Sequence, residues 1–181
     1  FLGDYQLGIY SKGYNLTVNI LKTINGSIIG VLYPNISKIK SSKAKLSNNF
    51  LEVSQNIISL YTPLVLLGFI LSEKVIGLIL GNEWLDLSEL IPIFLILTVI
   101  LASENVANQY VKVLGKTKML FKISVISSIV SFLSYIIGLK WGIFGVAVAY
   151  MLSRMISYLI LIINLKRLIK INLTKLFLHL I

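Results

Sequence analysis

Three charged side chains lie inside long apolar stretches of this sequence, and they are its strongest candidates for chemistry. Arg154 falls near the middle of the stretch from Gly142 to Leu165, while Lys22 and Glu104 fall within two other apolar stretches. A charge at the centre of a bilayer costs at least ~2.5–3.5 kcal/mol on insertion scales, so each side chain is expected to face protein or water. Two cations against one acid predict a water-filled, net-cationic cavity that receives an anionic headgroup.

Amide side chains accompany these charges. Asn15 and Asn19 precede Lys22 at helical spacing, and Asn108 and Gln109 follow the acid. Residues three or four apart share one face of a helix, so the amides are expected to line the same cavity. Two alternatives stay open: the amides can join packed helices to one another, and Lys22 can extend along its helix toward the cytoplasmic surface.

Glu104 and Arg154 are expected to form an ion pair. Their stretches run in the same direction across the membrane, and a helix rises ~1.5 Å per residue, which places the two side chains within roughly one helical turn in depth. An unpaired charge at that depth is expensive. Pairing leaves Lys22 as surplus positive charge, although the pair can also be purely architectural.

Composition assigns the chain to membrane proteins. Of its 181 residues 56% are hydrophobic and only 13% are charged, whereas soluble domains carry about a quarter charged residues. The net charge of +10 does not indicate nucleic acid binding, because the cations cluster between apolar stretches. The chain has no Cys and one His, His179, so we expect no metal centre and no cofactor.

Five apolar stretches are long enough to cross a bilayer as helices, which takes ~20 residues each. We predict an all-α integral membrane bundle, with residues 1–13 as a turn that leads into the first span, and loops at residues 35–49 and 72–89. Pro34 is expected to end the first span, and Pro63 invites a kink in the second. The predicted spans cover about residues 14–33, 50–71, 90–111, 119–139 and 142–165.

Charge between the spans predicts their orientation. The segments after the first, third and fifth spans are basic, the segment after the second is acidic, and the corner after the fourth carries one Lys. Cytoplasmic loops are enriched in Lys and Arg, so every odd span is expected to end in the cytoplasm. The chain starts with Phe1 and ends in an apolar segment at residues 176–181, so we expect a fragment of a longer protein whose next helix begins there.

Several short motifs, in this order and spacing, resemble one family of transporters. They are Gly8-Ile9-Tyr10 with Tyr14-Asn15-Leu16, Tyr33-Pro34-Asn35-Ile36-Ser37, Pro63-Leu64, Leu80-Gly81-Asn82-Glu83-Trp84, Leu114-Gly115-Lys116-Thr117 and Gly142-Ile143-Phe144-Gly145-Val146-Ala147. The chain resembles the O-antigen and capsular polysaccharide flippases of the multidrug/oligosaccharidyl-lipid/polysaccharide exporter superfamily.

The resemblance implies that residues 1–175 are most of the C-terminal lobe, about helices eight to twelve, of a fourteen-helix transporter in the bacterial inner membrane. Its implied substrate is an undecaprenyl-diphosphate-linked oligosaccharide. The diphosphate would meet Lys22 and Arg154, the sugar would meet amides and hydroxyls, and the polyprenyl tail would stay among membrane lipids. The absent N-terminal lobe would be the partner against which this lobe rocks.

Three other functions remain open at this stage. A multidrug antiporter of the same superfamily favours cationic drugs and therefore needs unpaired acids. A membrane enzyme of polysaccharide assembly needs acid–base residues grouped at one face, and the acidic segment at residues 72–89 is short and lacks His. A scaffold without transport activity needs no polar stripe on the first span, and the stripe is present.

Overall fold

The first pass through the bundle is a single helical rod. The computed structural model describes residues 3–171, leaving the side chains of residues 20 and 21 aside. The rod comprises α1 (Asp4–Tyr14), a π-helical segment η1 (Asn15–Asn19) and α2 (Ile20–Ile39). The expected apolar segment at residues 176–181 and His179 lie outside the described residues.

Two expectations for this first pass were wrong. Residues 4–13 are helical rather than a turn, and Pro34 lies inside α2 rather than at its end. Gly13 is selected by packing, because an added Cβ would lie 2.9 Å from Cε2 of Phe94. A proline removes one backbone donor, and a helix that packs against neighbours tolerates that loss.

The second pass, α3 (Lys43–Ile79), is much longer than the predicted span. Only residues 40–42 separate α2 from α3, where the Ser42 hydroxyl accepts a hydrogen bond from the Lys45 amide at 3.4 Å. After α3 the chain forms the 3-10 segment η2 (Asn82–Glu89). The predicted loops at residues 35–49 and 72–89 are therefore mostly helical, because polar residues extend these helices instead of ending them.

The last three spans match their predicted positions closely. They are α4 (Ile91–Val113), α5 (Thr117–Gly138) and α6 (Gly142–Ile169), with the 3-10 corner η3 (Leu139–Trp141) between the last two. Four apolar helical runs are long enough to cross a membrane, and the last of them, Thr117–Ile169, folds back on itself at η3. The described residues therefore make five helical passes, and none of them forms a strand.

Glycines allow the tight hairpin of α5 and α6. Gly142 adopts a φ of +68° at the corner, a conformation that side chains with a Cβ rarely take. A Cβ added at Gly138 would lie 2.7 Å from Cα of Val146, and one at Gly145 would lie 2.5 Å from the Gly138 carbonyl oxygen. Farther along, the hydroxyls of Ser131 and Ser153 meet at 3.2 Å. Small residues thus bring the two helices together, as expected inside a membrane.

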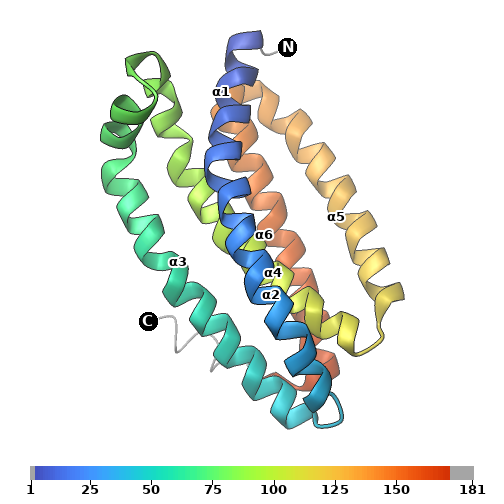
Figure 1. Cartoon of the computed structure of the whole chain (residues 1–181). Helices are drawn as coiled ribbons and strands as arrows, with labels where there is room; N and C mark the ends of the chain where they lie inside the picture. Colours follow the sequence, from blue (N-terminus) through green and yellow to red (C-terminus); the bar gives the residue numbers. More distant parts are fainter. Residues whose placement is uncertain (1–2, 172–181) are drawn as a thin grey trace.

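α4 is the most enclosed of the passes, lying among α2, α3 and α6 (Figure 1). Toward one end Phe94 packs with Ile9 and Leu87, and toward the other Tyr110 packs edge-to-face on Phe50. The Tyr110 hydroxyl also donates a hydrogen bond to Asn49 at 2.8 Å. By contrast, α3 and α5 present long apolar faces outward, which suits lipid or further protein.

The two ends of the bundle carry opposite charge. The α2–α3 and α4–α5 links and the end of α6 gather at one end, and η2 and η3 lie at the other (Figure 1). The first end holds Lys38, Lys40, Lys43, Lys45, Lys112, Lys116, Lys118, Lys122, Lys166, Arg167 and Lys170, whereas η2 carries three acids. This segregation and the apolar passes are those of a multi-pass membrane protein.

The orientation can be tested by labelling. The chain of 181 residues has no Cys, so the single changes Lys40→Cys and Glu83→Cys would each introduce one thiol reporter into it. We expect a membrane-impermeant thiol reagent to label them from opposite sides, with Lys40→Cys reactive only from the cytoplasm. Labelling of both positions from one side would overturn the orientation.

The glycine contacts generate a second prediction. Gly145→Ala should lower the stability of the detergent-solubilised protein by ~1–3 kcal/mol, the usual cost of overpacking, because its new methyl group meets the α5 backbone. Gly30→Ala is the matched control, since a Cβ at Gly30 has nothing within 4 Å. Equal thermal stability of the two variants would show that the hairpin does not depend on this close approach.

Candidate functional site

The ion pair between α4 and α6 lies at the centre of the candidate site. Nη2 of Arg154 donates to Oε2 of Glu104, so the structure brings these two residues together. Glu104 is only 8% exposed, and the Arg154 side chain is 19% exposed. Nε of Arg154 is buried and has no acceptor among the described residues. The pair is therefore enclosed but not saturated with hydrogen bonds.

A chain of polar contacts, here called the polar ladder, runs along the first pass through Ser11, Asn15, Asn19 and Lys22. Asn15 donates to Ser11 at 3.5 Å, Asn19 donates to Asn15, and the Lys22 amine donates to the Asn19 side-chain oxygen at 3.4 Å. All four side chains are exposed on the described chain. The stripe expected from the spacing is thus a continuous hydrogen-bonded row on an open face.

The polar ladder crosses the π-helical segment η1. A π-helix holds one extra residue in a turn, and such segments occur often at functional sites. Asn15 and Asn19 form its two ends, so the wider turn lies between the two amides.

The Lys22 amine is directed toward earlier turns of its helix. It lies 5.8 Å from the centre of the Tyr14 ring, in addition to its bond with Asn19. Both contacts lie away from the basic end of the bundle, so extension toward the cytoplasmic surface does not describe this side chain.

Tyr14 connects the polar ladder to the ion pair. Its ring contacts Lys22, packs edge-to-face on Phe94 at 5.8 Å, and its hydroxyl interacts with Tyr150 and lies within electrostatic reach of Arg154. Lys22 of the first pass therefore contacts the Tyr14 ring directly, and the charge of Arg154 on α6 acts on the Tyr14 hydroxyl. Sequence reasoning missed Tyr14 as a site residue. The signal was available in the helical spacing of Tyr14 with Lys22 and of Tyr150 with Arg154.

The structure separates the remaining two predicted site residues. Asn108 follows Glu104 by four positions on α4, so the two share a face, and Asn108 is half-buried. Gln109 lies roughly 140° around the helix from Glu104, because each residue turns an α-helix by about 100°. Gln109 is 7% exposed and belongs to a different face. Asn108 is thus placed toward the candidate site and Gln109 is not.

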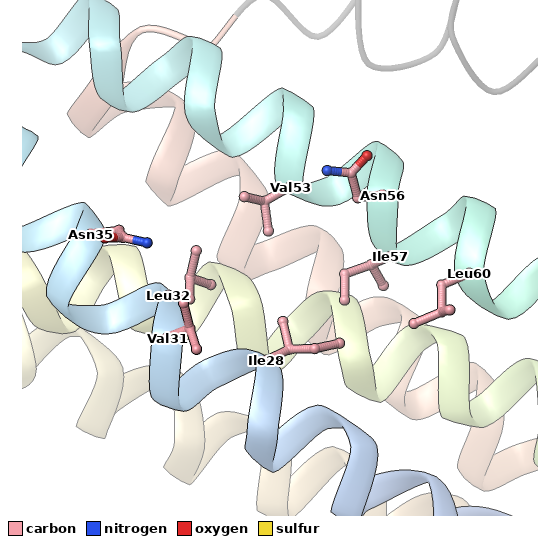
Figure 2. Close-up of a pocket in the computed structure, with 8 residues that line it drawn as sticks. All are labelled: Ile28, Val31, Leu32, Asn35, Val53, Asn56, Ile57 and Leu60. Atoms are coloured by element: carbon pink, nitrogen blue, oxygen red, sulfur yellow. The ribbon is translucent and has the colours of Figure 1, made fainter.

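A separate groove of about 500 Å³ lies between α2 and α3. Its walls are mostly aliphatic side chains such as Leu32, Ile57 and Leu60, and the amides of Asn35 and Asn56 flank it (Figure 2). It lies closer to the basic end than Lys22 does, and its lining includes no charged residue. It is therefore not part of the candidate site.

Charge and hydrogen bonding define what the site can do. Glu104–Arg154 is the only ion pair within residues 3–171, and it is neutral as a unit. Among the residues that the structure describes, Lys22 contacts only neutral groups, so its positive charge is not paired there and stands beside donors and acceptors. Such a surface can attract an anion and hydrogen-bond a polar molecule.

Comparisons with known proteins agree with this membrane architecture. Residues 1–89 match the family described as "Polysaccharide biosynthesis protein". The chain is 28% identical over 165 residues to "Uncharacterized membrane protein in cps region" of Klebsiella pneumoniae, covering 88% of this chain and 33% of that protein. It is 26% identical over 160 residues to "Lipopolysaccharide biosynthesis protein WzxC" of Escherichia coli K12, covering 86% of this chain and 32% of that protein.

The chain spans about a third of the length of these curated relatives. No solved structure matches it.

The ion pair yields a prediction for stability. Glu104→Gln leaves the buried guanidinium without its carboxylate, and breaking a buried pair from one side costs ~3–5 kcal/mol. We expect a correspondingly lower thermal stability in detergent, and the exchange Glu104→Arg with Arg154→Glu should recover most of it. Glu52→Gln, which removes an exposed acid of α3, is the control and should change little. An exchange variant no better than the single variants would argue against direct pairing.

Proposed function

We propose that this chain is a segment of a polysaccharide flippase-type membrane protein and that it forms one wall of a net-cationic cavity for a lipid-linked oligosaccharide. The family matched by residues 1–89 and the relative named "Lipopolysaccharide biosynthesis protein WzxC" support a role in polysaccharide biosynthesis, to which the proposal adds export across the inner membrane. The proposed step is translocation of an undecaprenyl-diphosphate-linked oligosaccharide across that membrane. The substrate and the whole protein's activity are part of the proposal, since this chain spans only about a third of its relatives.

The observation that carries the proposal is the environment of Lys22. Its amine lies within a membrane-crossing helix, on an exposed face, and contacts an amide and a ring but no carboxylate. A lone cation is expensive in lipid, so this face is expected to line water or protein. A diphosphate can bind there through charge-assisted hydrogen bonds without having to displace an acid from the amine.

The surrounding groups suit the rest of such a headgroup. The amides of the polar ladder offer donors and acceptors to sugar hydroxyls beyond the phosphates. Arg154 keeps a buried Nε donor, and its charge acts on Tyr14, whose ring contacts Lys22. The two cations can therefore act on one ligand, with Glu104 holding the guanidinium in position.

The rest of the transporter would supply the opposite wall. We propose that these passes are about the eighth to twelfth of a fourteen-helix protein, and that residues 1–175 form most of its C-terminal lobe. The N-terminal lobe would face the polar ladder, the polyprenyl tail would stay in the lipid, and rocking of the lobes would expose the cavity to each side in turn.

The pairing of Glu104 weakens the case for a multidrug antiporter. Such a protein needs an available carboxylate for cationic drugs, whereas the buried acid of this site is already engaged by Arg154. A membrane enzyme of polysaccharide assembly stays a weaker candidate, because no observation here favours it.

Substitution of Lys22 tests the proposal. In the full-length protein, Lys22→Gln should reduce surface glycan export by roughly ten-fold or more, because hydrogen bonds to charged groups contribute ~1.5–3 kcal/mol. Lys22→Arg should retain much of the activity, since it preserves the charge. Export would be measured as surface polysaccharide in a strain that lacks the native protein.

Lys12→Gln is the matched control. Lys12 lies on the same pass as Lys22 but outside the polar ladder. Like Lys22 it lies near an aromatic ring, with its amine 5.4 Å from the centre of the Trp84 ring. Its replacement should leave export near the wild-type level. Wild-type export by Lys22→Gln, at equal protein abundance, would refute the cationic cavity.

A further inference from the structure

A second basic site lies at the opposite end of the bundle from η2, where α3 begins and α6 ends. A cavity of about 470 Å³ is lined there by Lys43, Ser47, Asn48, Leu51, Ile169 and Lys170. A neighbouring cavity of about 550 Å³ also uses Lys170, together with Lys166, Arg167 and two isoleucines. Lys170 lines both cavities, and the residues of the two cavities together are called the basic pocket below.

The start of α3 and the end of α6 both lie at this basic pocket. Lys170 adopts the left-handed conformation at φ 55°, and its amide bonds to the Lys166 carbonyl at 2.9 Å, which ends α6 at this point. On the other side, Lys43 and Ala44 open α3, and the first amides of a helix have no acceptor within it. Ser47, one turn later, lines the cavity and is only 9% exposed.

The charge of the basic pocket is uncompensated in the described part of the chain. No Asp or Glu lines either cavity, and none of their cations forms an ion pair there. The nearest acid in sequence on α3 is Glu52, an exposed residue that does not line the cavity and whose charge acts on Tyr110. Four cations therefore line the two cavities, and no acid among the described residues lines either of them.

The walls add an apolar component. Leu51 and Ile169 line one cavity, and Ile163 and Ile171 line the other, beside the charged groups. A free inorganic anion gains nothing from contact with apolar side chains, whereas a lipid carries a phosphate and acyl chains in one molecule. Basic pockets between helices at the cytoplasmic side of membrane proteins bind anionic lipid headgroups.

We propose that the basic pocket binds the phosphodiester headgroup of an anionic membrane lipid, such as cardiolipin or phosphatidylglycerol. Lys43 and Lys170 contact the phosphate from the two helices, Ser47 and Asn48 donate hydrogen bonds to it, and the acyl chains lie along Leu51 and Ile163. The lipid thereby fastens the start of α3 to the end of α6. This site is independent of the cavity around Lys22, so either proposal can fail without the other.

Lipid titration of the full-length protein in neutral detergent, followed by native mass spectrometry, tests the assignment. Cardiolipin should bind with measurable affinity and phosphatidylcholine should not. The double change Lys43→Gln and Lys170→Gln should weaken cardiolipin binding about 25-fold, since each basic residue near an anionic surface contributes roughly fivefold.

The matched control is Lys118→Gln with Lys122→Gln, which removes the same charge at the same end but from exposed positions outside both cavities. Its cardiolipin affinity should stay within about threefold of the wild type. Equal weakening in both double variants would overturn the proposal, because it would show general attraction without a site. Competition by inorganic phosphate at the concentration of the lipid would also overturn it, because the site would then be one for free anions.

A second measurement does not depend on the lysine variants. Leu51→Trp places a fluorophore on the wall of the basic pocket, away from Trp84 and Trp141 at the other end. Vesicles that contain brominated phosphatidylglycerol should quench it more strongly than vesicles with brominated phosphatidylcholine at equal bromine content. Equal quenching by the two lipids would contradict selective binding.

Discussion

A buried guanidinium and carboxylate set the main constraint on this structure. Arg154 of α6 and Glu104 of α4 neutralise each other's charge inside an apolar bundle, so the two helices must keep one relative depth and rotation. Around Arg154, Ser153 and Ser157 donate their hydroxyl hydrogens to carbonyls of their own helix, those of Tyr150 and Ser153. Because the pair is neutral as a unit, Lys22 is the described intramembrane residue that gives the site its net positive charge.

The sequence predicted the passes well and their ends poorly. For α4, α5 and α6 an apolar run coincides with a helix, so hydropathy and helix bounds agree to within a few residues. For α2 and α3 they differ, because a helix does not end where the lipid does. Residues 43–49 extend α3 ahead of the predicted span, and residues 72–79, which include the apolar Val75, Ile76, Leu78 and Ile79, extend it past that span. Pro34 misled for a related reason, because its missing donor is a small loss in a rod with packed neighbours.

Those parts of the candidate site were predictable that depend only on the depth of a residue in the membrane and on its position around its own helix. Depth brought Glu104 to Arg154, and spacing brought Asn15 and Asn19 into line with Lys22. Gln109 was predicted to line the same cavity as Asn108. It lies on a different face of α4 from Glu104, because neighbours in sequence are about 100° apart around a helix. The role of Tyr14 was not predictable, because its contacts with Phe94 and Tyr150 depend on the tertiary packing of the first pass.

The widened turn of η1 acts as an inserted residue in the first pass. Upstream of it Ile9 packs beside Phe94, and downstream Ile36 packs with Phe50 and Tyr110 at the far end of α4. Because one residue shifts helical phase by about 100°, an uninterrupted α-helix of the same length could not seat both halves equally well. The bulge thus adjusts the rotation of α2 relative to α1 so that both halves pack on α4. Homologous chains that lack it should be one residue shorter between the positions of Ile9 and Ile36.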